Sequence, residues 1–355
     1  AELGEPIETF TARYIAAMHE DDDRLNILRP DHEPRATEHV AGMIALAATL
    51  IEKGYAYVAS NGDVMYSVAS FEPYGKLSGK RLADLRAGAR IEVEDAKRDP
   101  LDFVLWKRAK PGEPSWDSPW GPGRPGWHIE CSVMSAEILG DEFDIHAGGM
   151  DLKFPHHENE IAQSCAATGD HFANVWMHNG FVVDTEGEKM SKSLGNVANL
   201  LDLVEHYDPR AYRLVLLQTH YRGPVRISQD NIDASVNALS GLDSFAARTV
   251  SVSSGAAPDG DVMLKFRDFM DNDLDTPSAV ALLFETVRAA NTALDANDSR
   301  AAQLSAAVHE ICQAFGLELK QAVAVPQDIA TKAAALDAAR SAKDFATADV
   351  LRGEL

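Results

Sequence analysis

The stretch that decides the fold is G-G-M-D-L-K-F-P-H-H-E-N-E at residues 148–160. On a helix, side chains four residues apart lie on the same face, so His156 and Glu160 can reach one ligand together. Pro155, directly before them, fits the first turn of a helix and would place the pair near its start. Zn²⁺ favours imidazole, carboxylate and thiolate ligands, and the upstream G-W-H-I-E-C supplies a thiol at Cys131. Together the three side chains predict a zinc site with one position open for a substrate.

Each of these signals alone has a simpler explanation. A histidine and a glutamate at this spacing usually form a solvated pair, and a single cysteine is usually a small buried apolar residue. A third motif, K-M-S-K-S at 189–193, changes the balance. Its lysines, Lys189 and Lys192, flank a hydroxyl-rich turn and could neutralise charge on a transferring phosphate. One lysine alone would indicate a solvated basic turn, whereas the complete motif beside a thiol-binding metal suggests an enzyme that activates cysteine.

The segments around the motifs alternate as in an α/β nucleotide domain. We predict a helix over 128–139, a strand over 143–146, a glycine turn at Gly148 and Gly149, and then the helix of the metal pair. In open parallel sheets ligands bind at the carboxyl ends of the strands, and glycines let the backbone approach a nucleotide closely. Residues 178–183, H-N-G-F-V-V, are predicted to form a short buried strand that leads into K-M-S-K-S.

Longer versions of these motifs occur along most of the chain. They are D-F-V-L-W-K at 102–107, P-G-E-P-S-W at 111–116, G-R-P-G-W-H-I-E-C-S at 123–132, F-P-H-H-E-N-E-I-A-Q-S at 154–164 and G-E-K-M-S-K-S-L-G-N at 187–196. In them the sequence resembles cysteinyl-tRNA synthetase, a family of class I aminoacyl-tRNA synthetases. The resemblance implies ATP-dependent activation of L-cysteine to cysteinyl-adenylate, followed by transfer to tRNA(Cys).

The resemblance also implies how the substrate cysteine is held. Cys131, His156 and Glu160 would be the zinc ligands, with His146 near the metal and Trp127 forming a wall of the cysteine pocket. The zinc would bind the substrate as its thiolate. Serine lacks a comparably soft, acidic ligand, so the metal could discriminate where a size sieve would give modest ratios.

A second set of residues is implied to bind ATP, which the family uses as a substrate with Mg²⁺. Gly148, Gly149 and Asp151 fall where the family holds the adenosine. Lys192 would contact ATP and stabilise the α-phosphate transition state, with Lys189 helping to hold the loop. No side chain need act as a strong base, because positioning and electrostatics can suffice.

Two features of the family do not occur in residues 1–355: the H-I-G-H signature that cradles ATP phosphates and the cysteine that usually gives the fourth zinc ligand. Both belong to a segment that would precede Ala1, and the opening A-E-L-G-E-P-I-E-T-F resembles the middle of the family's first half. We therefore interpret the sequence as a truncated or incompletely represented chain, and we expect that its residues alone do not complete the active site.

The expected fold class is α/β: a Rossmann-like nucleotide domain with an inserted connective domain, then an α-helical bundle and the start of an anticodon-binding domain. The predicted divisions are 1–30 for the remainder of the first catalytic half, 31–120 for the insertion, 121–196 for the second catalytic half, 197–235 for a stem-contact region, 236–320 for the bundle and 325–355 for the start of the anticodon domain.

Local patterns predict further elements inside these divisions. They are helices over 6–20 and 36–53, a β-hairpin around Asn61-Gly62, helical segments over 229–249 and 260–297, and a helix near 300–315.

Composition sets broad limits. A chain of 355 residues with 45% apolar and 25% charged content is an ordinary globular protein of more than one domain. Its longest apolar runs are too short to span a membrane. The cysteines Cys131, Cys165 and Cys312 do not form a disulfide framework, which suits a cytoplasmic protein. We also expect a monomer.

The net charge of −22 conflicts with a tRNA partner, because nucleic-acid binders usually carry a basic face. Net charge does not report local distribution, so the motifs decide in favour of tRNA. Basic residues of the insertion could approach the acceptor end, and scattered solubilising charge explains them equally well; they are Lys76, Lys80, Arg81, Lys107, Arg108 and Lys110.

Two other functions fit part of the sequence. The cysteine ligase of mycothiol synthesis resembles the chain at the zinc site, but joins cysteine to an amino-sugar. That family lacks an anticodon domain, so the segment after Pro326 favours the synthetase. A non-catalytic zinc- or RNA-binding fragment is the alternative from a different class.

Overall fold

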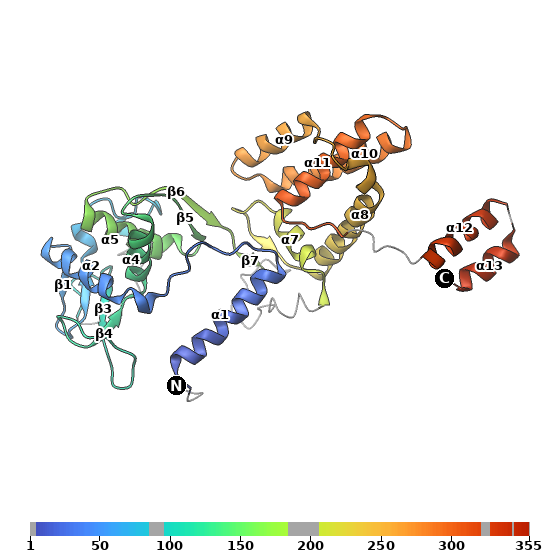
Figure 1. Ribbon diagram of the computed structural model, residues 1–355. Helices are drawn as coiled ribbons and strands as arrows, with labels where there is room; N and C mark the ends of the chain where they lie inside the picture. The colour runs from blue at the N-terminus through green and yellow to red at the C-terminus, as the bar shows by residue number, and fades with distance from the viewer. Residues whose placement is uncertain (1–4, 85–95, 184–205, 321–326, 343, 355) are drawn as a thin grey trace. The chain divides into compact units, whose positions relative to one another are not determined.

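The computed structural model describes residues 5–84, 96–183, 206–320, 327–342 and 344–354. They divide into two compact units, each described below by itself (Figure 1). The first comprises residues 28–183 with 221–225, and the second takes in the described parts of 1–27, 184–220 and 226–355. The K-M-S-K-S motif, with Lys189 and Lys192, lies outside the described residues.

The first unit contains an antiparallel sheet in the order β1-β2-β3-β4. Its strands are β1 (Ala56–Val58), β2 (Val64–Tyr66), β3 (Phe103–Arg108) and β4 (Gly123–Pro125). The predicted hairpin is confirmed, because Ala56 pairs with Tyr66 across a turn in which Gly62 has φ +88°. That left-handed conformation costs glycine little, which explains the Asn-Gly pair.

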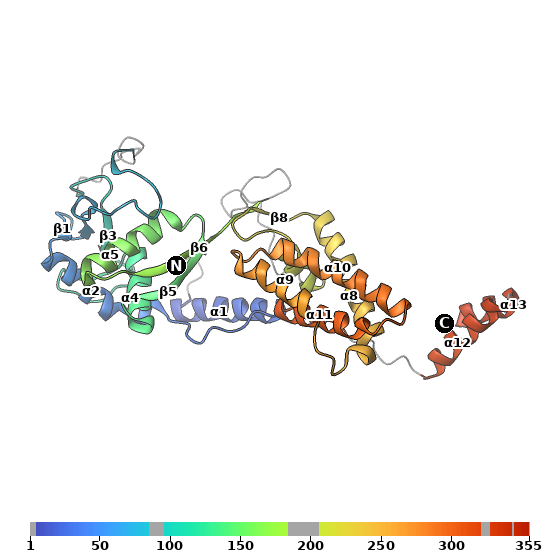
Figure 2. The same ribbon diagram turned by 90° about the horizontal axis from the view of Figure 1, so that it is seen from above.

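Three helices pack beside this sheet: α2 (Val40–Glu52), α4 (Trp127–Leu139) and α5 (Glu158–Thr168) (Figures 1 and 2). The predicted helix over 36–53 begins as a 3₁₀ turn, Ala36–Glu38, before α2. Met43 and Leu50 recur at helical spacing and are fully buried, and burial of such a side chain contributes about 1.5–3 kcal/mol. The shared core also contains Tyr66, Leu105, Trp106, Ile129 and Ala162.

Strand β5 (Phe143–Gly149) and strand β6 (Ala173–Asn179) form a parallel pair, with α5 as the crossover between them. The predicted helix over 128–139 and the strand over 143–146 are thus confirmed, the strand being three residues longer at its end. Between β5 and α5 a short turn, Lys153–His157, has extended backbone at Phe154. The pairing sets Gly149 opposite Asn179 at the carboxyl ends of the two strands.

The predicted single strand over 178–183 is wrong. Strand β6 ends at Asn179, and a separate strand β7 (Val182–Val183) pairs with β8 (Val225–Arg226). The chain changes partner at Gly180, whose N–H donates to the Tyr221 carbonyl over 2.7 Å. A Cβ at Gly180 would lie 2.1 Å from the Gly223 carbonyl oxygen, so the close backbone approach requires glycine.

The second unit is helical, with an apolar core. Its helices are α1 (Ile7–Arg24), α7 (Pro209–Leu217), α8 (Gln229–Ser253), α9 (Gly260–Asp271), α10 (Thr276–Asp295) and α11 (Arg300–Ala314). Leu239, Leu283 and Ile311 bring three of these helices together in the core. The helical pattern predicted over 260–297 is interrupted, because Asp273 and Leu274 have φ +57° and +55°. Asp275 then caps α10 by accepting a hydrogen bond from the Ser278 N–H.

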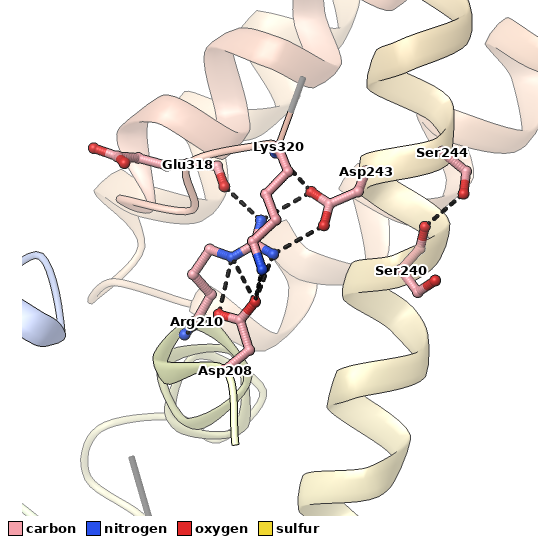
Figure 3. A network of polar contacts seen from close by, with 7 residues as sticks. All are labelled: Asp208, Arg210, Ser240, Asp243, Ser244, Glu318 and Lys320. Carbon is pink, nitrogen blue, oxygen red and sulfur yellow. Dashed lines mark hydrogen bonds and ion pairs between the residues drawn. The ribbon is translucent and has the colours of Figure 1, made fainter. Parts of the chain in front are cut away.

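A polar network around Arg210 joins the start of α7 to α8 and to the segment after α11 (Figure 3). The guanidinium donates to both oxygens of Asp208 and both oxygens of Asp243. A further bond runs to the Glu318 carbonyl. Lys320 completes the network, since its Nζ lies 2.7 Å from Asp208 Oδ2 and its backbone N–H donates to Asp243.

The last two helices, α12 (Gln327–Ser341) and α13 (Phe345–Glu354), form a hairpin with a small core of its own. Leu336 and Ala339 pack there against Ala348 and Leu351. Among the described residues, no helix combines the length and the apolar content needed to cross a membrane.

Candidate metal and nucleotide site

The three predicted metal ligands come together from two helices. Cys131 lies on α4, His156 in the turn before α5, and Glu160 in the first turn of α5. One ligand atom from each lies within 4.8 Å of the other two. His156 Nε2 is 2.7 Å from Glu160 Oε1, so the expected four-residue spacing does place the two side chains on one face.

Glu160 carries the charge of this cluster and is fully buried. Its second oxygen, Oε2, lies 2.9 Å from Nε2 of His146. Both contacts are within ion-pair distance, yet neither oxygen accepts a hydrogen bond of good geometry from any described residue. Burial raises the pKa of Glu160, but the adjacent His146 and His156 rings outweigh that effect and hold the pKa below its ordinary value. The carboxylate is therefore ionised and poorly satisfied, as a cation ligand would be before the cation binds.

The pKa of the Cys131 thiol is shifted in the opposite direction from that of Glu160. Burial, together with the negative charges of Glu160 and Glu130, raises its pKa to about 12. A thiol in these surroundings stays protonated at neutral pH unless a cation lies beside it. Thiolate, imidazole and carboxylate around one point form a donor set that suits Zn²⁺, so the residues present fit the metal that the sequence predicts.

Sequence reasoning missed His128, which lies one helical turn before Cys131 on α4. Its Nδ1 is 2.9 Å from Nδ1 of His156. Burial and the neighbouring His156 lower the pKa of His128 to about 4, so the ring is neutral at physiological pH and can accept a hydrogen bond. With Nε2 of His156 turned to the metal position, its Nδ1–H would donate to His128, an outer contact that fixes ring orientation. The i−3 spacing from Cys131 was the available signal.

His146 is placed beside the cluster, as expected, and it also belongs to a second convergence. One ligand atom each from His146, His157 and Glu160 lies within 4.8 Å of the others. His157 Nδ1 in turn lies 2.9 Å from His178 Nε2, and burial lowers the pKa of His157 to about 4. Glu160 thus lies between His156 on one side and the pair of His146 and His157 on the other. Besides burial, the nearby rings of His146 and His156 help to lower the pKa of His157.

Trp127, expected to line the cysteine pocket, begins α4. Its ring centroid is 4.5 Å from that of His156, while 60% of the residue remains exposed. The indole thus lies against one side of the His156 ring and presents its other side to solvent.

The glycines expected near adenosine occupy the carboxyl end of β5. A Cβ at Gly148 would lie 2.9 Å from the His157 ring, and one at Gly149 would lie 2.5 Å from Asp151 Oδ1. A side chain at Gly148 would thus press on the buried His157 ring, whereas at Gly149 the Asp151 side chain could move aside. Asp151 itself is exposed in the turn that follows the strand. Strand ends of a parallel pair are where α/β folds bind ligands, and His156 and Glu160 follow this strand end a few residues farther along the chain.

Comparison with known families gives two matches. The model of the tRNA synthetases class I (C) catalytic domain matches residues 1–237. The DALR domain model matches residues 265–320, which cover part of α9 and all of α10 and α11. The latter match lies within the helical bundle.

Individual relatives give the same picture. A cysteine–tRNA ligase of Thioalkalivibrio sulfidiphilus is 53% identical over 365 residues, covering 100% of this chain and 79% of that protein. One from Methylococcus capsulatus is 51% identical over 375 residues, with the same coverage of 100% and 79%. Methionyl-tRNA synthetase of Mycobacterium tuberculosis, solved in complex with methionyl-adenylate, has a TM-score of 0.60 at 15% identity and covers 88% of this chain and 78% of that one.

The structural likeness is a likeness of fold, and with the catalytic-domain match it confirms the predicted α/β class I synthetase architecture. Sequence identities of 53% and 51% over the whole chain carry the narrower assignment. The chain belongs to the cysteine–tRNA ligases, a family of class I aminoacyl-tRNA synthetases.

Proposed function

We propose that this protein selects L-cysteine at a zinc site made by Cys131, His156 and Glu160, activates it with ATP, and transfers it to tRNA(Cys). The observation that carries the proposal is the convergence of these three donors around an ionised, poorly satisfied carboxylate. When bound, Zn²⁺ supplies a soft Lewis acid that prefers a thiolate to the hydroxyl of serine. Membership of the cysteine–tRNA ligases supports the same substrate.

The protein's own residues would orient the amino acid. His156 lies in the turn that leads directly into α5 and Glu160 in the first turn of that helix, so backbone hydrogen bonding would fix their relative positions. His128 would hold the ring of His156 in place, and His146 would do the same for the second oxygen of Glu160. Trp127 would form the wall against which the cysteine side chain packs.

The nucleotide would bind at the carboxyl end of β5. Gly148 and Gly149 would let the backbone approach the adenosine, and Asp151 would contact it. Lys192, with Lys189 holding the loop, would neutralise charge on the α-phosphate and on the leaving pyrophosphate, which the family delivers as a Mg²⁺ complex.

The predicted divisions of the chain become part of this proposal. Residues 1–30 and 121–196 would belong to the catalytic domain, 31–120 to its insertion, and 197–235 to a stem contact. Residues 236–320 would form the bundle, and 325–355 would begin the anticodon-binding domain. We propose a monomer that works in the cytoplasm, where its three unpaired thiols stay reduced.

Exchange of radiolabelled pyrophosphate into ATP tests the proposal, with the full-length protein and with L-cysteine or L-serine as the amino acid. We expect exchange with cysteine and none above background with serine, followed by charging of tRNA(Cys). Exchange without charging of tRNA, together with ligation of cysteine to an amino-sugar, would support the mycothiol-type ligase instead. The absence of cysteine-dependent exchange would contradict enzymatic activation.

A further inference from the structure

A segment of the insertion, residues 71–80, lies against the helix that carries the metal ligands; we call it the strap. The carboxylate of Glu158, the first residue of α5, is almost fully buried beneath it. One oxygen accepts the Gly75 N–H over 2.9 Å, and the other accepts the Ser78 N–H over 2.8 Å. A single side chain of the helix therefore fixes two points of the strap backbone.

Side chains of the insertion make three more contacts with residues 154–162, the segment that contains His156 and Glu160. The Tyr74 hydroxyl donates to Asn159 Oδ1, and the Tyr66 hydroxyl of β2 donates to the Ala162 carbonyl over 2.9 Å. Lys80 Nζ lies 4.1 Å from the centre of the Phe154 ring, a cation–π distance. Phe154 comes two residues before His156, and Asn159 directly precedes Glu160, so the contacts bracket both ligands.

The backbone conformation of the strap depends on Gly75 and on its hydrogen bond with Lys80. Gly75 has φ +95°, and a Cβ there would lie only 2.0 Å from the Lys80 carbonyl oxygen. The Lys80 N–H donates back to the Gly75 carbonyl over 3.1 Å, which closes the loop. Only glycine fits this position, so the turn that presents its two N–H groups to Glu158 is tightly built.

The geometry of the helix separates the strap from the ligands. Within α5, Glu158 and Ala162 each lie about 160° around the helix axis from Glu160. Through Glu158 the strap therefore contacts the face of α5 that is opposite Glu160. Because a buried carboxylate with two donors resists displacement, a shift of the strap moves the first turn of α5 with it.

From these contacts we propose that the strap, together with Tyr66 of β2, is a positioning element for the metal centre: through Glu158, Tyr74 and Tyr66 these contacts set where His156 and Glu160 stand relative to Cys131. The inference rests on the proposed function of these ligands. Substitutions in the strap contacts should change the geometry of the bound metal and the binding of cysteine, while ATP binding stays as it is.

Three tyrosines provide a matched test. Tyr74→Phe and Tyr66→Phe each remove one hydroxyl that reaches α5, whereas Tyr57→Phe removes a buried hydroxyl that donates to Asp102 within the insertion, over 2.7 Å. Each full-length variant is loaded with Co²⁺ in place of zinc, and its visible ligand-field spectrum, thermal midpoint and KM values are measured. Glu158→Gln is the stronger perturbation, because its amide would face two N–H donors. Cys131→Ser serves as the reference for the site itself.

We expect Tyr74→Phe, Tyr66→Phe and Glu158→Gln to bind Co²⁺ with altered ligand-field bands. Their KM for cysteine should rise by about tenfold, the lower range for lost outer-shell support, with KM for ATP unchanged. Tyr57→Phe should keep the wild-type spectrum and both KM values even where its thermal midpoint falls equally. Wild-type spectra and KM for cysteine in the strap variants would overturn the inference, as would an equal spectral change in Tyr57→Phe.

The Co²⁺ spectrum of the wild-type protein distinguishes failure of the strap inference from failure of the proposed metal site. A sulfur-to-cobalt charge-transfer band that is weaker in Cys131→Ser supports the metal site, whatever the strap variants do. A wild-type protein without that band would remove the metal site and, with it, the role of the strap.

Discussion

Replacing Arg210 by methionine should destabilise the helical unit strongly, because this side chain is the shared partner of two carboxylates (Figure 3). Its side chain is 13% exposed, and those of Asp208 and Asp243 are 22% and 21% exposed. Removing one member of a buried ion pair costs about 3–5 kcal/mol, since the other charge is left without compensation. Partial exposure and the remaining Lys320 contact place the expected loss near the lower end, at about 3 kcal/mol.

The sign of the pH dependence follows from the two carboxyl groups. The hydrogen bond from Arg210 lowers the pKa of Asp208. For Asp243, burial acts to raise the pKa, but the hydrogen bonds and charges of Arg210 and Lys320 together outweigh burial and lower it. A carboxyl whose pKa is depressed by folding contributes stability that is complete above its unfolded value, about 3.9, and is lost as the pH falls through the folded value. The difference between wild type and Arg210→Met should therefore be constant from about pH 8 to 5 and shrink below about pH 4.

Hydrogen exchange of the α8 amides at increasing urea concentration measures the free energy of opening of this unit. Arg210→Lys keeps the charge but loses the planar fork, and should cost about 1–2 kcal/mol. Arg248→Met is the matched control on α8, because its pair with Asp295 is 47% and 70% exposed and should be worth less than about 0.5 kcal/mol. A loss in Arg210→Met no larger than that of the control, or a difference that grows below pH 4, would refute the reasoning.

Two further predictions concern catalysis and metal binding. For Lys192→Ala we expect pyrophosphate exchange to slow by about 2–4 kcal/mol of barrier, the cost of an oxyanion-type contact, and wild-type exchange rates would remove Lys192 from the mechanism. His128→Ala should weaken zinc binding by about 10–100-fold in competition with a chelator, because His156 loses its Nδ1 partner. His128→Asn, whose side-chain oxygen can accept the same hydrogen bond, should recover part of that affinity, and equal affinities in all three proteins would count against the orienting contact.

The cluster of Cys131, His156 and Glu160 could be anticipated because its chemistry is local. Helical spacing sets the last two on one face, and a soft metal explains the addition of a thiol from another helix. Hairpin β1–β2 and the order of strand β5 followed by helix α5 were equally accessible, since turn residues and periodicity encode them, whereas strand β6 was not predicted. The class I synthetase fold and the cysteine substrate were predicted from the resemblance to the cysteinyl-tRNA synthetase family.

Other features depend on which segments meet in space. The strand β6 ends before Gly180, where the backbone of Gly223 approaches closely. The periodicity of H-N-G-F-V-V does not indicate that contact, because it depends on a distant segment of the chain. The sequence around Glu158 gives no sign of its burial, yet its carboxylate is buried and accepts hydrogen bonds from the backbone N–H groups of Gly75 and Ser78. The roles of Lys189 and Lys192 stay predictions, because the K-M-S-K-S motif lies outside the described residues.

The most direct test of a sulfur-binding metal centre is zinc K-edge X-ray absorption on the zinc-loaded full-length protein, compared with Cys131→Ser. The expected wild-type spectrum contains a zinc–sulfur shell near ~2.3 Å and a nitrogen/oxygen shell near ~2.0–2.1 Å. Cys131→Ser should lose one sulfur, and added L-cysteine should contribute one sulfur to the wild type. A nitrogen/oxygen shell alone, or equal sulfur counts in the two proteins, would contradict the assignment of Cys131 as a ligand.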